Sequence, residues 1–379
     1  MMKLSDDIIT LFKLFNKEGY KLYIVGGAVR DYLLGRDIED YDFATSAPPC
    51  EMIKILDGYL IDTYQEKLGS IKVHLNNQVF EITTFRKEYG VRDLRYPIHI
   101  EYVDDLKDDV LRRDFTINSL GYSVDEGVVD YLGGIKDLND QLIRFNKDTK
   151  ESVLEDPIRI IRAHRFSLLL NFNLSSDDVI VFSNYSYLVN SLGKIKYDEL
   201  KKLFKIKGCK EFILKYIAIY QKAYPIFGHK LFINALKSDL PIEYLKYVLS
   251  YLDEEFSDLS KKDKIILNGL KEFDLNINDL YQTKVLLIKY HNKFDIVLEI
   301  LESFGYNISK FKENLNIIRR EKHCLNIKDL AITYKDLENL NINIKDYSKV
   351  LKSLLNKVLC DYKLNEKEKL VELVKKGDY

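Results

Sequence analysis

Residues 26–47 read GGAVRDYLLGRDIEDYDFATSA, and this stretch decides how the N-terminal part of the chain folds. It begins where a short apolar segment, KLYIVGG, stops at Gly26 and Gly27, as a buried strand does before a turn. A helical pattern with Arg30 in its first turn follows. Glycines have no Cβ atom, so the backbone can approach a phosphate group closely, and Arg30 can reach the same phosphate. The alternative is a plain strand–helix turn with a structural arginine.

Two acidic residues, Asp40 and Asp42, follow in the alternating segment DYDFAT. Residues two apart on a strand share a face, so both carboxylates are expected on one side of a sheet. Converging carboxylates repel each other unless a cation lies between them, and Mg²⁺ favours carboxylate and phosphate oxygens. We therefore expect Asp40 and Asp42 to be catalytic ligands of a pair of Mg²⁺ ions, which can activate a hydroxyl and stabilise pyrophosphate. The alternative is a solvated acidic edge, since Asp37 and Glu39 are close by.

The composition is that of a globular protein, with 46% hydrophobic and 31% charged residues and a formal net charge of -1 over 379 residues. A nucleic-acid partner therefore needs a local basic surface, because the overall charge attracts none. The four cysteines form no C-x-x-C pair, which argues against a zinc site or a disulfide framework. Reduced thiols, an amphipathic rather than signal-like N-terminus and no membrane-length apolar run together indicate a cytoplasmic protein.

The glycine content and the hydrophobic pattern of the sequence change near residue 138. Before it, glycines, short strands and short helices mix, and SIKVHLNNQVFEITTFR (residues 70–86) predicts a hairpin around Asn76 and Asn77. After it, glycine is rare and apolar residues recur at three- and four-residue spacing, as in IEYLKYVLSYL (residues 242–252). The expected fold class is α+β, with a head of helices and a small mixed sheet followed by an all-α remainder.

The order GG-x-V-R-D followed by D-x-D-F-x-T resembles the catalytic signature of the DNA polymerase β-type nucleotidyltransferases. More narrowly, it resembles the class II tRNA nucleotidyltransferases, the bacterial CCA-adding enzymes, and the related bacterial poly(A) polymerases. The segment RRDFTINSLGY (residues 112–122) is similar to the second motif of this family. The resemblance implies that Arg113 meets the triphosphate, that Asp114 accepts a hydrogen bond from a ribose hydroxyl, and that Asn118 also belongs to the nucleotide site. Without the other motifs, the segment would be interpreted as a structural Arg-Asp pair.

The segment LEDPIRIIRAHRF (residues 154–166) places Asp156 and Arg159 three apart, on one face of a helix that Pro157 begins. An acceptor beside a donor suits cytosine and adenine, which present an amino group next to a ring-nitrogen acceptor, and it rejects guanine and uracil. Alone, the pair would read as an ordinary ion pair worth a few tenths of a kcal/mol. The segment also resembles the base-selecting E-D-x-x-R motif of the family, which implies that Arg162 and Arg165 contact the nucleotide.

Two further parts of the site are expected. Glu81, on a strand beside the D-x-D strand, is a candidate third metal ligand, and a structural role with Arg86 is the alternative. The segment RKEYGVRDLRYP (residues 86–97) resembles the specificity loop of CCA-adding enzymes, with its R-x-E and D-x-R series at Arg86, Glu88, Asp93 and Arg95. Because family members that add only C residues have a shortened loop, its presence here favours addition of the complete C-C-A end.

The C-terminal segment resembles the helical tail of bacterial CCA-adding enzymes, and the resemblance implies contact with the elbow of tRNA. Lysines 345, 349, 352 and 357 recur there at helical spacing and could meet phosphates, although a solvated basic face is the alternative. Asn341, Asn343 and Asp346 stand where the family has glycines. Glu199, in GKIKYDELKKLF, matches a family motif that supports packing of the neck.

The resulting expectation has four domains: a catalytic head (1–138), a helical neck that recognises the nucleobase (139–207), a helical body (208–322) and a tRNA-binding tail (323–379). The expected activity is template-independent transfer of CMP, CMP and AMP from CTP and ATP to the 3′ end of tRNA. A poly(A) polymerase and a partial CC- or A-adding enzyme are the alternatives within the family. An RNA-binding scaffold without activity and a small-molecule nucleotidyltransferase are the alternatives outside it. Neither DNA nor a membrane is an expected partner.

Overall fold

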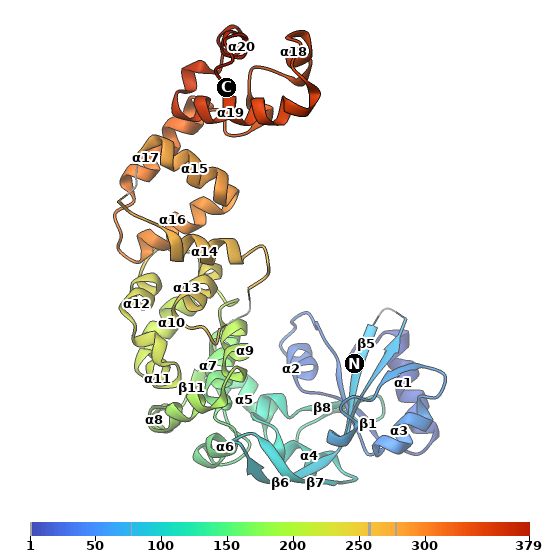
Figure 1. The fold of residues 1–379 in the computed structure, drawn as a ribbon. Coiled ribbons are helices and arrows are strands. Elements are labelled where there is room, and N and C mark those ends of the chain that lie inside the picture. Colours follow the sequence, from blue (N-terminus) through green and yellow to red (C-terminus); the bar gives the residue numbers. More distant parts are fainter. Residues whose placement is uncertain (1, 77, 257–258, 277–278) are drawn as a thin grey trace. The chain divides into compact units, whose positions relative to one another are not determined.

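The computed structural model describes residues 2–76, 78–256, 259–276 and 279–379 (Figure 1). The chain divides into two compact units, Met1–Phe227 and Gly228–Tyr379. The first unit contains the mixed sheet and the second is helical, in line with the expected fold class. The finer division into head, neck, body and tail remains a prediction, and the words head and neck are kept below for residues 1–138 and 139–207.

The head is built on a seven-stranded sheet with the order β3-β4-β5-β2-β1-β8-β9. The strands are β1 Leu22–Val25, β2 Asp42–Thr45, β3 Leu60–Asp62, β4 Ser70–Leu75, β5 Gln78–Thr84, β8 Gly121–Ser123 and β9 Gly127–Val129. Neighbouring strands are antiparallel except β2 and β5, which run parallel. The predicted hairpin is confirmed as β4 and β5, while Asn77 of its turn lies outside the described residues.

Three helices of the head are α1 Asp6–Lys17, α2 Gly27–Leu33 and α3 Pro49–Ile55. The hydroxyl of Ser5 caps α1 by accepting a hydrogen bond from the backbone N–H of Ile8 at 3.4 Å. The apolar face of α1 packs on the sheet, where the Phe12 ring meets the Phe43 ring edge-on with centroids 6.2 Å apart. The amphipathic N-terminal helix expected from the sequence is therefore part of the head's core.

The second motif (residues 112–122) lies among short helical turns. The 3₁₀ helix η2 Val110–Arg112 leads into it and η3 Thr116–Asn118 lies within it, while α4 Leu106–Asp109 precedes it and α5 Gly134–Asn139 follows it. Phe115, fully buried, joins this region to the neck, with its ring 4.8 Å from that of Phe145 and 5.7 Å from that of Phe166. The motif is thus anchored by an aromatic core that includes Phe145 and Phe166.

The expected specificity loop is a β-hairpin of two seven-residue strands, β6 Arg86–Arg92 and β7 Tyr96–Tyr102 (Figure 1). It forms a two-stranded sheet of its own, apart from the main sheet of the head. Asp93 and Leu94 make the turn with φ angles of 55° and 56°, the left-handed region that non-glycine residues seldom adopt. This segment therefore has a defined, paired backbone rather than an irregular one.

The neck and the end of unit 1 consist of α6 Thr149–Glu155, α7 Ile158–Leu170, α8 Ser176–Tyr185, α9 Ile195–Leu203, α10 Cys209–Lys215 and α11 Ile217–Ala223. One expectation needs correction. The remainder after the head also contains a short parallel pair, β10 Leu142–Ile143 with β11 Asn173–Leu174. Asn171 makes this return possible, because its left-handed conformation (φ 57°) ends α7 and turns the chain back along β10.

Unit 2 contains α12 Lys230–Lys237, α13 Leu245–Leu252, α14 Lys264–Glu272, α15 Leu280–Tyr290, α16 Phe294–Ser303, α17 Ser309–Arg320, α18 Tyr334–Asn339, α19 Tyr347–Cys360 and α20 Lys367–Lys375. Asn341 adopts the left-handed φ of 57° and Asn343 accepts a hydrogen bond from the N–H of Lys345, so asparagines make the turn between α18 and α19. Within the described ranges, no helix is both long and apolar enough to cross a lipid bilayer.

Candidate active site

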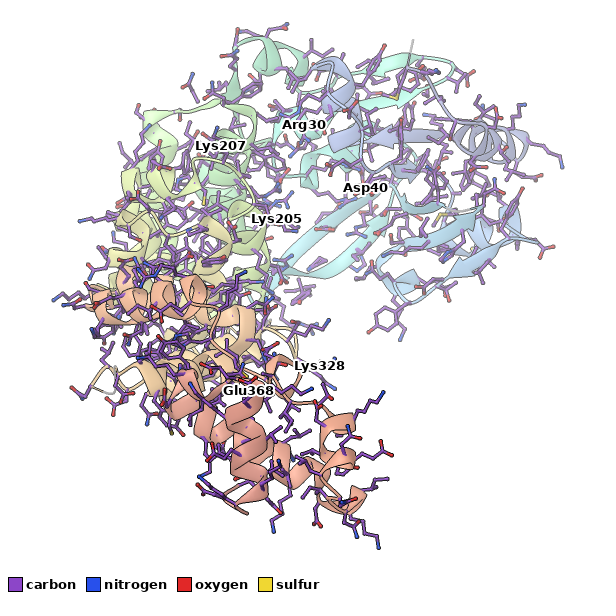
Figure 2. The ribbon with its side chains drawn as sticks, turned by 90° about the horizontal axis from the view of Figure 1, so that it is seen from above. Arg30, Asp40, Lys205, Lys207, Lys328 and Glu368 are labelled. Atoms are coloured by element: carbon purple, nitrogen blue, oxygen red, sulfur yellow. The ribbon has the colours of Figure 1, made fainter. Side chains whose placement is uncertain are left out.

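A cavity of about 680 Å³ in unit 1 lies between the head and helices α7 and α9 of the neck. It gathers residues from all the motifs that the sequence singled out. The expected site residues among its lining are Gly26, Gly27, Arg30, Asp40, Asp42, Arg95, Arg113, Asp114, Asn118, Asp156, Arg159, Arg162 and Arg165. Glu81, Arg86, Glu88 and Asp93 lie outside this lining. Figure 2 shows Arg30 and Asp40 on the side of the head that faces the neck helices of the same unit.

The glycine turn requires its first glycine. Gly26 has φ 73° and ψ −132°, a conformation that disfavours any residue with a Cβ atom. A Cβ placed there would lie 3.9 Å from Nη1 of Arg113, so the turn and this guanidinium face each other. The strand β1 ends at Val25 and α2 begins at Gly27, as the sequence predicts.

Arg30 is held inside the protein, with 6% of its surface exposed. Its Nε and Nη2 donate to the two oxygens of Asp31 at 2.9 and 2.8 Å, and its Nη1 donates to Oδ1 of Asn118 at 2.7 Å. Asn118 in turn donates from Nδ2 to Oδ1 of Asp114 at 3.2 Å. Arg30 therefore connects the glycine turn with the second motif, and a phosphate would meet a guanidinium that is already fixed in place.

Asp114 lies at the centre of a charged network. Its Oδ2 accepts a hydrogen bond from Nε of Arg162 at 2.8 Å and lies 2.6 Å from Nη2 of Arg162 in an ion pair, and its Oδ1 accepts from the N–H of Phe115 at 2.8 Å. Burial alone would raise the pKa of Asp114, but the Arg162 guanidinium and these hydrogen bonds hold it below its ordinary value. Asp114 is thus an ionised acceptor whose oxygens already have partners, and a ribose hydroxyl would have to share or replace one of them.

Two arginines of α7 meet an acid from α9. Glu199 Oε2 accepts from Nε of Arg165 at 2.8 Å, and its Oε1 lies 3.3 Å from Nη1 of Arg162 and 2.9 Å from Nζ of Lys202. The buried ring of Phe166 supports the same group, with the guanidinium of Arg165 at 4.2 Å from its centroid and that of Arg162 at 5.6 Å. Glu199 therefore contacts three cations that line the cavity, and its role goes beyond packing of the neck.

The acidic end of the cavity contains Asp40 and Asp42. One detail of the prediction is wrong: β2 begins at Asp42, so Asp40 precedes the strand. Asp42 is paired across the parallel strands with Glu81. The surrounding protein removes part of the hydration of Asp42, and this effect, together with the negative charges of Glu81 and Asp40, raises the pKa of its carboxyl group. Oxygen ligands with accumulated negative charge fit Mg²⁺.

Glu81 has partners of its own. Its Oε1 accepts from the hydroxyl of Ser70 at 2.9 Å, and its Oε2 lies 3.6 Å from Nζ of Lys72. Arg86, the alternative partner considered from the sequence, pairs with Glu88 instead. Among the described residues, no three acidic, histidine or cysteine side chains are already gathered as a ligand set for a metal ion. Glu81 is therefore paired with Asp42 across the strands while its side chain contacts Ser70 and Lys72, and its role as a third metal ligand stays a prediction.

The expected base reader differs in detail from its sequence pattern. Asp156 is the C-cap of α6 with φ −149°, so it precedes α7 instead of sharing a helical face with Arg159. Arg159 donates from Nη1 to Oε2 of Glu155 at 3.1 Å and from Nη2 to the carbonyl of Arg112 at 3.1 Å. In the described part of the chain, the ion pairs of Arg159 do not include Asp156. Burial raises the pKa of Asp156. The two side chains are therefore not engaged with each other.

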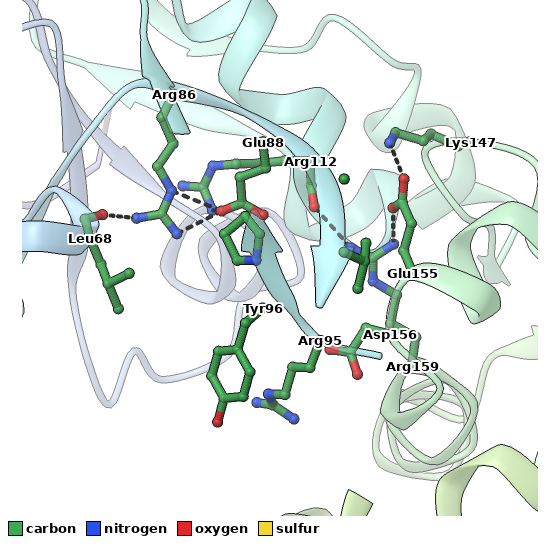
Figure 3. Close-up of a pocket in the computed structure, with 13 residues that line it drawn as sticks. Leu68, Arg86, Glu88, Arg95, Tyr96, Arg112, Lys147, Glu155, Asp156 and Arg159 are labelled. Atoms are coloured by element: carbon green, nitrogen blue, oxygen red, sulfur yellow. Dashed lines mark hydrogen bonds and ion pairs between the residues drawn. The ribbon is translucent and has the colours of Figure 1, made fainter. Parts of the chain in front are cut away.

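The hairpin β6–β7 lines a neighbouring cavity of about 600 Å³ (Figure 3). Figure 3 shows Arg86 paired with Glu88, and Glu155 bonded to both Lys147 and Arg159. Arg95, at the hairpin turn, lines both cavities, together with Asp156 and Arg159. Asp93 lines neither of them. Of the four expected loop residues, the structure thus brings only Arg95 to the cavity that contains Asp40 and Asp42.

Several residues that order the site were not singled out from the sequence as site residues. The partners of its arginines are Asp31, Asp109, Glu155 and Glu199, and the ring that three arginines approach is Phe166. Asp109 and Glu155 stand four residues before Arg113 and Arg159, a spacing at which oppositely charged side chains meet on a helical turn. That signal is present in the sequence. Glu199 lies too far along the chain for any spacing rule to connect it with Arg162.

Comparison with known proteins places the chain in a family. A family model described as the poly(A) polymerase head domain matches residues 22–144. The CCA-adding enzyme of Staphylococcus epidermidis is 30% identical over 397 residues, which cover 96% of each chain. The CCA-adding enzyme of Lactobacillus gasseri is 40% identical over 200 residues, which are 53% of this chain and 49% of that protein.

Solved structures show the same fold. The Bacillus stearothermophilus CCA-adding enzyme in complex with CTP superposes with a TM-score of 0.66 and 21% identity, covering 99% of this chain and 98% of that one. The Thermotoga maritima CCA-adding enzyme complexed with tRNA gives a TM-score of 0.67 and 20% identity, with 99% and 96% covered. These structural similarities confirm the α+β architecture. The relative at 30% identity, aligned over 96% of both chains, shows which family the chain belongs to. The chain belongs to the CCA-adding enzyme family, the class II tRNA nucleotidyltransferases.

Proposed function

We propose that this protein transfers CMP, CMP and AMP in turn from CTP and ATP to the 3′ end of tRNA and releases pyrophosphate at each step. One observation carries the proposal. A single cavity brings together the acids Asp40 and Asp42, the second-motif residues Arg113 and Asp114, and the pair Asp156 and Arg159. Structures of the family described as complexes with CTP, ATP and tRNA support this choice of substrates.

Asp40 and Asp42 would hold Mg²⁺ at the acidic end of the cavity. When bound there, Mg²⁺ would lower the pKa of the terminal 3′-hydroxyl and neutralise charge on the leaving pyrophosphate. The residues of the chain would position the triphosphate. The glycine turn leaves room for phosphate oxygens, and Arg113 faces that turn with a guanidinium already fixed. Asp114 would accept a hydrogen bond from the ribose, which demands a ribonucleotide.

Asp156 and Arg159 would choose the base. The Asp156 carboxylate would accept from the exocyclic amino group of cytosine or adenine, and Arg159 would donate to the adjacent ring nitrogen. Arg159 is suited to this task because Glu155 and the carbonyl of Arg112 fix its guanidinium, so its remaining donor direction is set by the protein. Guanine and uracil would present a carbonyl oxygen to the carboxylate, which leaves a buried acceptor without a partner.

The proposal also gives the helical C-terminal segment a role in tRNA binding. We expect residues 323–379 to contact the elbow of tRNA through phosphates, with lysines 345, 349, 352 and 357 as candidates. Lys357 already forms an ion pair with Asp378 at 2.7 Å, so it is the least available of the four. A cytoplasmic location is part of the same proposal.

The test uses a tRNA transcript that ends before the CCA sequence, with Mg²⁺ and each nucleotide supplied singly and together. We expect two C residues with CTP alone, a complete CCA end with CTP and ATP, and no incorporation from GTP or UTP. Long A tails would favour a poly(A) polymerase, and addition that stops after CC would identify a partial enzyme. No incorporation under any of these conditions would overturn the proposal.

A further inference from the structure

Asp109 is the most completely enclosed carboxylate near the site. Its side chain is 0% exposed, at the end of α4 and outside the lining of the cavity. Oδ2 accepts from Nε and Nη2 of Arg113 at 3.1 and 2.9 Å. Oδ1 accepts from Nε of Arg112 at 2.8 Å and from the backbone N–H of Arg86 at 3.2 Å. Four donors thus converge on one buried carboxylate from two separate segments.

The charge of Asp109 is retained in this enclosed place. Burial alone would raise the pKa of its carboxyl, but the guanidinium groups of Arg113 and Arg112 and their hydrogen bonds hold the pKa below its ordinary value. A buried carboxylate with all its acceptor directions used fixes its partners firmly, because any rotation would leave a charged group unpaired. Arg113, whose side chain is 17% exposed, is therefore not a freely moving surface arginine.

The contact with Asp109 also decides which nitrogen of Arg113 faces the cavity. Nε and Nη2 are taken by Asp109, and Nη1 lies 3.9 Å from the point where a Cβ of Gly26 would stand. We infer that Asp109 is a positioning residue that presents Nη1 of Arg113 to the triphosphate at the glycine turn. This inference rests on the proposed function, because it assigns the triphosphate to that turn.

The same carboxylate reaches the hairpin. Arg86, the first residue of β6, donates its N–H to Asp109, and Arg112 lies between Asp109 and Glu88, with Nη1 at 3.7 Å from Oε1 of Glu88. The base of the hairpin and the triphosphate-facing arginine therefore share one anchor. Loss of that anchor would loosen Arg113 directly, and it would also free the start of β6.

The first test is Asp109→Asn, which keeps the shape of the side chain and removes its charge. We expect the Kd for CTP to rise about tenfold or more, since hydrogen bonds to a charged group are lost. The preference for CTP over UTP should stay unchanged, because Asp156 and Arg159 are untouched. Asp137→Asn is the matched control: Asp137 is also buried and accepts from Nε of Arg144 at 2.9 Å, but it lies outside the cavity lining.

A double-mutant cycle separates positioning from a loss of stability. If Asp109 acts through Arg113, then Asp109→Asn should add little to the CTP affinity loss already caused by Arg113→Ala. Arg113→Lys provides a test that does not depend on the folding of the Asp109 variant. A lysine cannot bond to Asp109 with two nitrogens and present a third, so we expect weaker CTP binding in this variant also.

The outcomes are distinct. Wild-type CTP affinity in Asp109→Asn or Arg113→Lys, or fully additive losses in the cycle, would overturn the positioning role. An equal loss in Asp137→Asn would overturn it as well, since any buried aspartate would then suffice. If the wild-type protein itself neither binds CTP nor extends tRNA, the proposed function fails, and this result is seen before any variant is compared.

Discussion

His164 gives a prediction whose size follows from the structure. It lies on α7, the helix that carries Arg159, Arg162 and Arg165, and its side chain is fully buried. Aromatic rings surround it, with that of Tyr216 stacked at 4.7 Å. The other rings in contact belong to Phe182, Phe212 and Tyr220. Among the described residues, neither ring nitrogen has a hydrogen-bond partner. Burial lowers the pKa of His164 from 6.5 to about 3.

The sign of the effect follows from proton binding. Between the folded and unfolded pKa values the unfolded chain binds a proton that the folded chain does not, so acid favours unfolding. The stability is complete above the unfolded value of 6.5 and is lost as the pH falls from there toward about 3. Between about pH 8 and about pH 5, His164 alone should lower the free energy of unfolding by about 2 kcal/mol.

The assay compares the wild type with His164→Phe by urea unfolding at both pH values. Circular dichroism is the suitable signal, because the chain has no tryptophan. Phenylalanine keeps a planar ring among the aromatic neighbours and removes both nitrogens, so the acid sensitivity should shrink by about 2 kcal/mol in the transition that involves unit 1. Other titrating groups act equally in both proteins and cancel in the difference.

A comparison substitution is His74→Gln, on β4 at a partly exposed position, which removes a histidine outside this buried aromatic cluster. If the stability of His164→Phe falls between the two pH values as steeply as that of the wild type, the histidine is not held neutral by burial, and the reasoning is wrong. Because α7 carries three arginines of the site, the same experiment reports whether acid weakens the site's framework.

The remaining predictions concern the site. Asp42→Ala should abolish every nucleotide addition, measured by gel analysis of labelled tRNA, and residual activity would refute its assignment as a metal ligand. Glu81→Gln should leave the Mg²⁺ concentration for half-maximal rate little changed, because Glu81 is bonded to Lys72 and Ser70; a large increase would make it a ligand. Asp156→Ala should cost about 1–3 kcal/mol of discrimination between CTP and UTP with a smaller loss of triphosphate binding; unchanged selectivity would count against the base reader. Deletion of residues 88–95 should abolish A addition and spare C addition, and equal loss of both would contradict a specificity role.

Much of the fold could be predicted because its elements follow simple periodicities. The strand before Gly26, the hairpin of β4 and β5, and α13 each carry an apolar pattern that packing preserves. The hairpin of β6 and β7 could not be recognised in this way. Its strands are partly or fully exposed along their length, β6 is mostly charged, and the turn at Asp93 and Leu94 lacks the Asn-Gly or Asp-Gly sequence typical of a tight turn. Its strands pair through the backbone, which no side-chain pattern records.

The break between α10 and α11 also could not be predicted from the sequence. The segment CKEFILKYIAIYQKAY keeps a helical spacing throughout, yet α10 ends at Lys215 and α11 begins at Ile217. Tyr216, between them, stacks on His164 with ring centroids 4.7 Å apart. His164 is far from Tyr216 in the sequence, so the local sequence pattern does not reveal this contact. Local propensity continues across the break, and packing against α7 overrides it.

The site was predictable where chemistry requires a residue type at a fixed spacing, and unpredictable where it requires a distant partner. Asp40 and Asp42 were proposed as metal ligands from the sequence because acids two residues apart can share a cation, and both line the cavity. Some partners of the arginines come from distant segments, as with Glu199 on α9 and Arg162 on α7. Asp156 and Arg159 were expected as neighbours on a helix, and instead a helix boundary lies between them.

These anchoring contacts bear on how a protein can choose a base without a nucleic-acid template. An arginine that moved freely could donate to a carbonyl oxygen as easily as to a ring nitrogen, so it would accept all four bases. Each arginine of the cavity that comes from the glycine turn, the second motif or α7 is instead bonded to at least one acid. These pairs are Arg30 with Asp31, Arg113 with Asp109, Arg159 with Glu155, Arg162 with Asp114 and Glu199, and Arg165 with Glu199. Fixed donors lose little conformational entropy on binding and leave an unmatched base with unpaired polar groups. We therefore expect discrimination between bases to depend on the acids behind the arginines as much as on the arginines themselves.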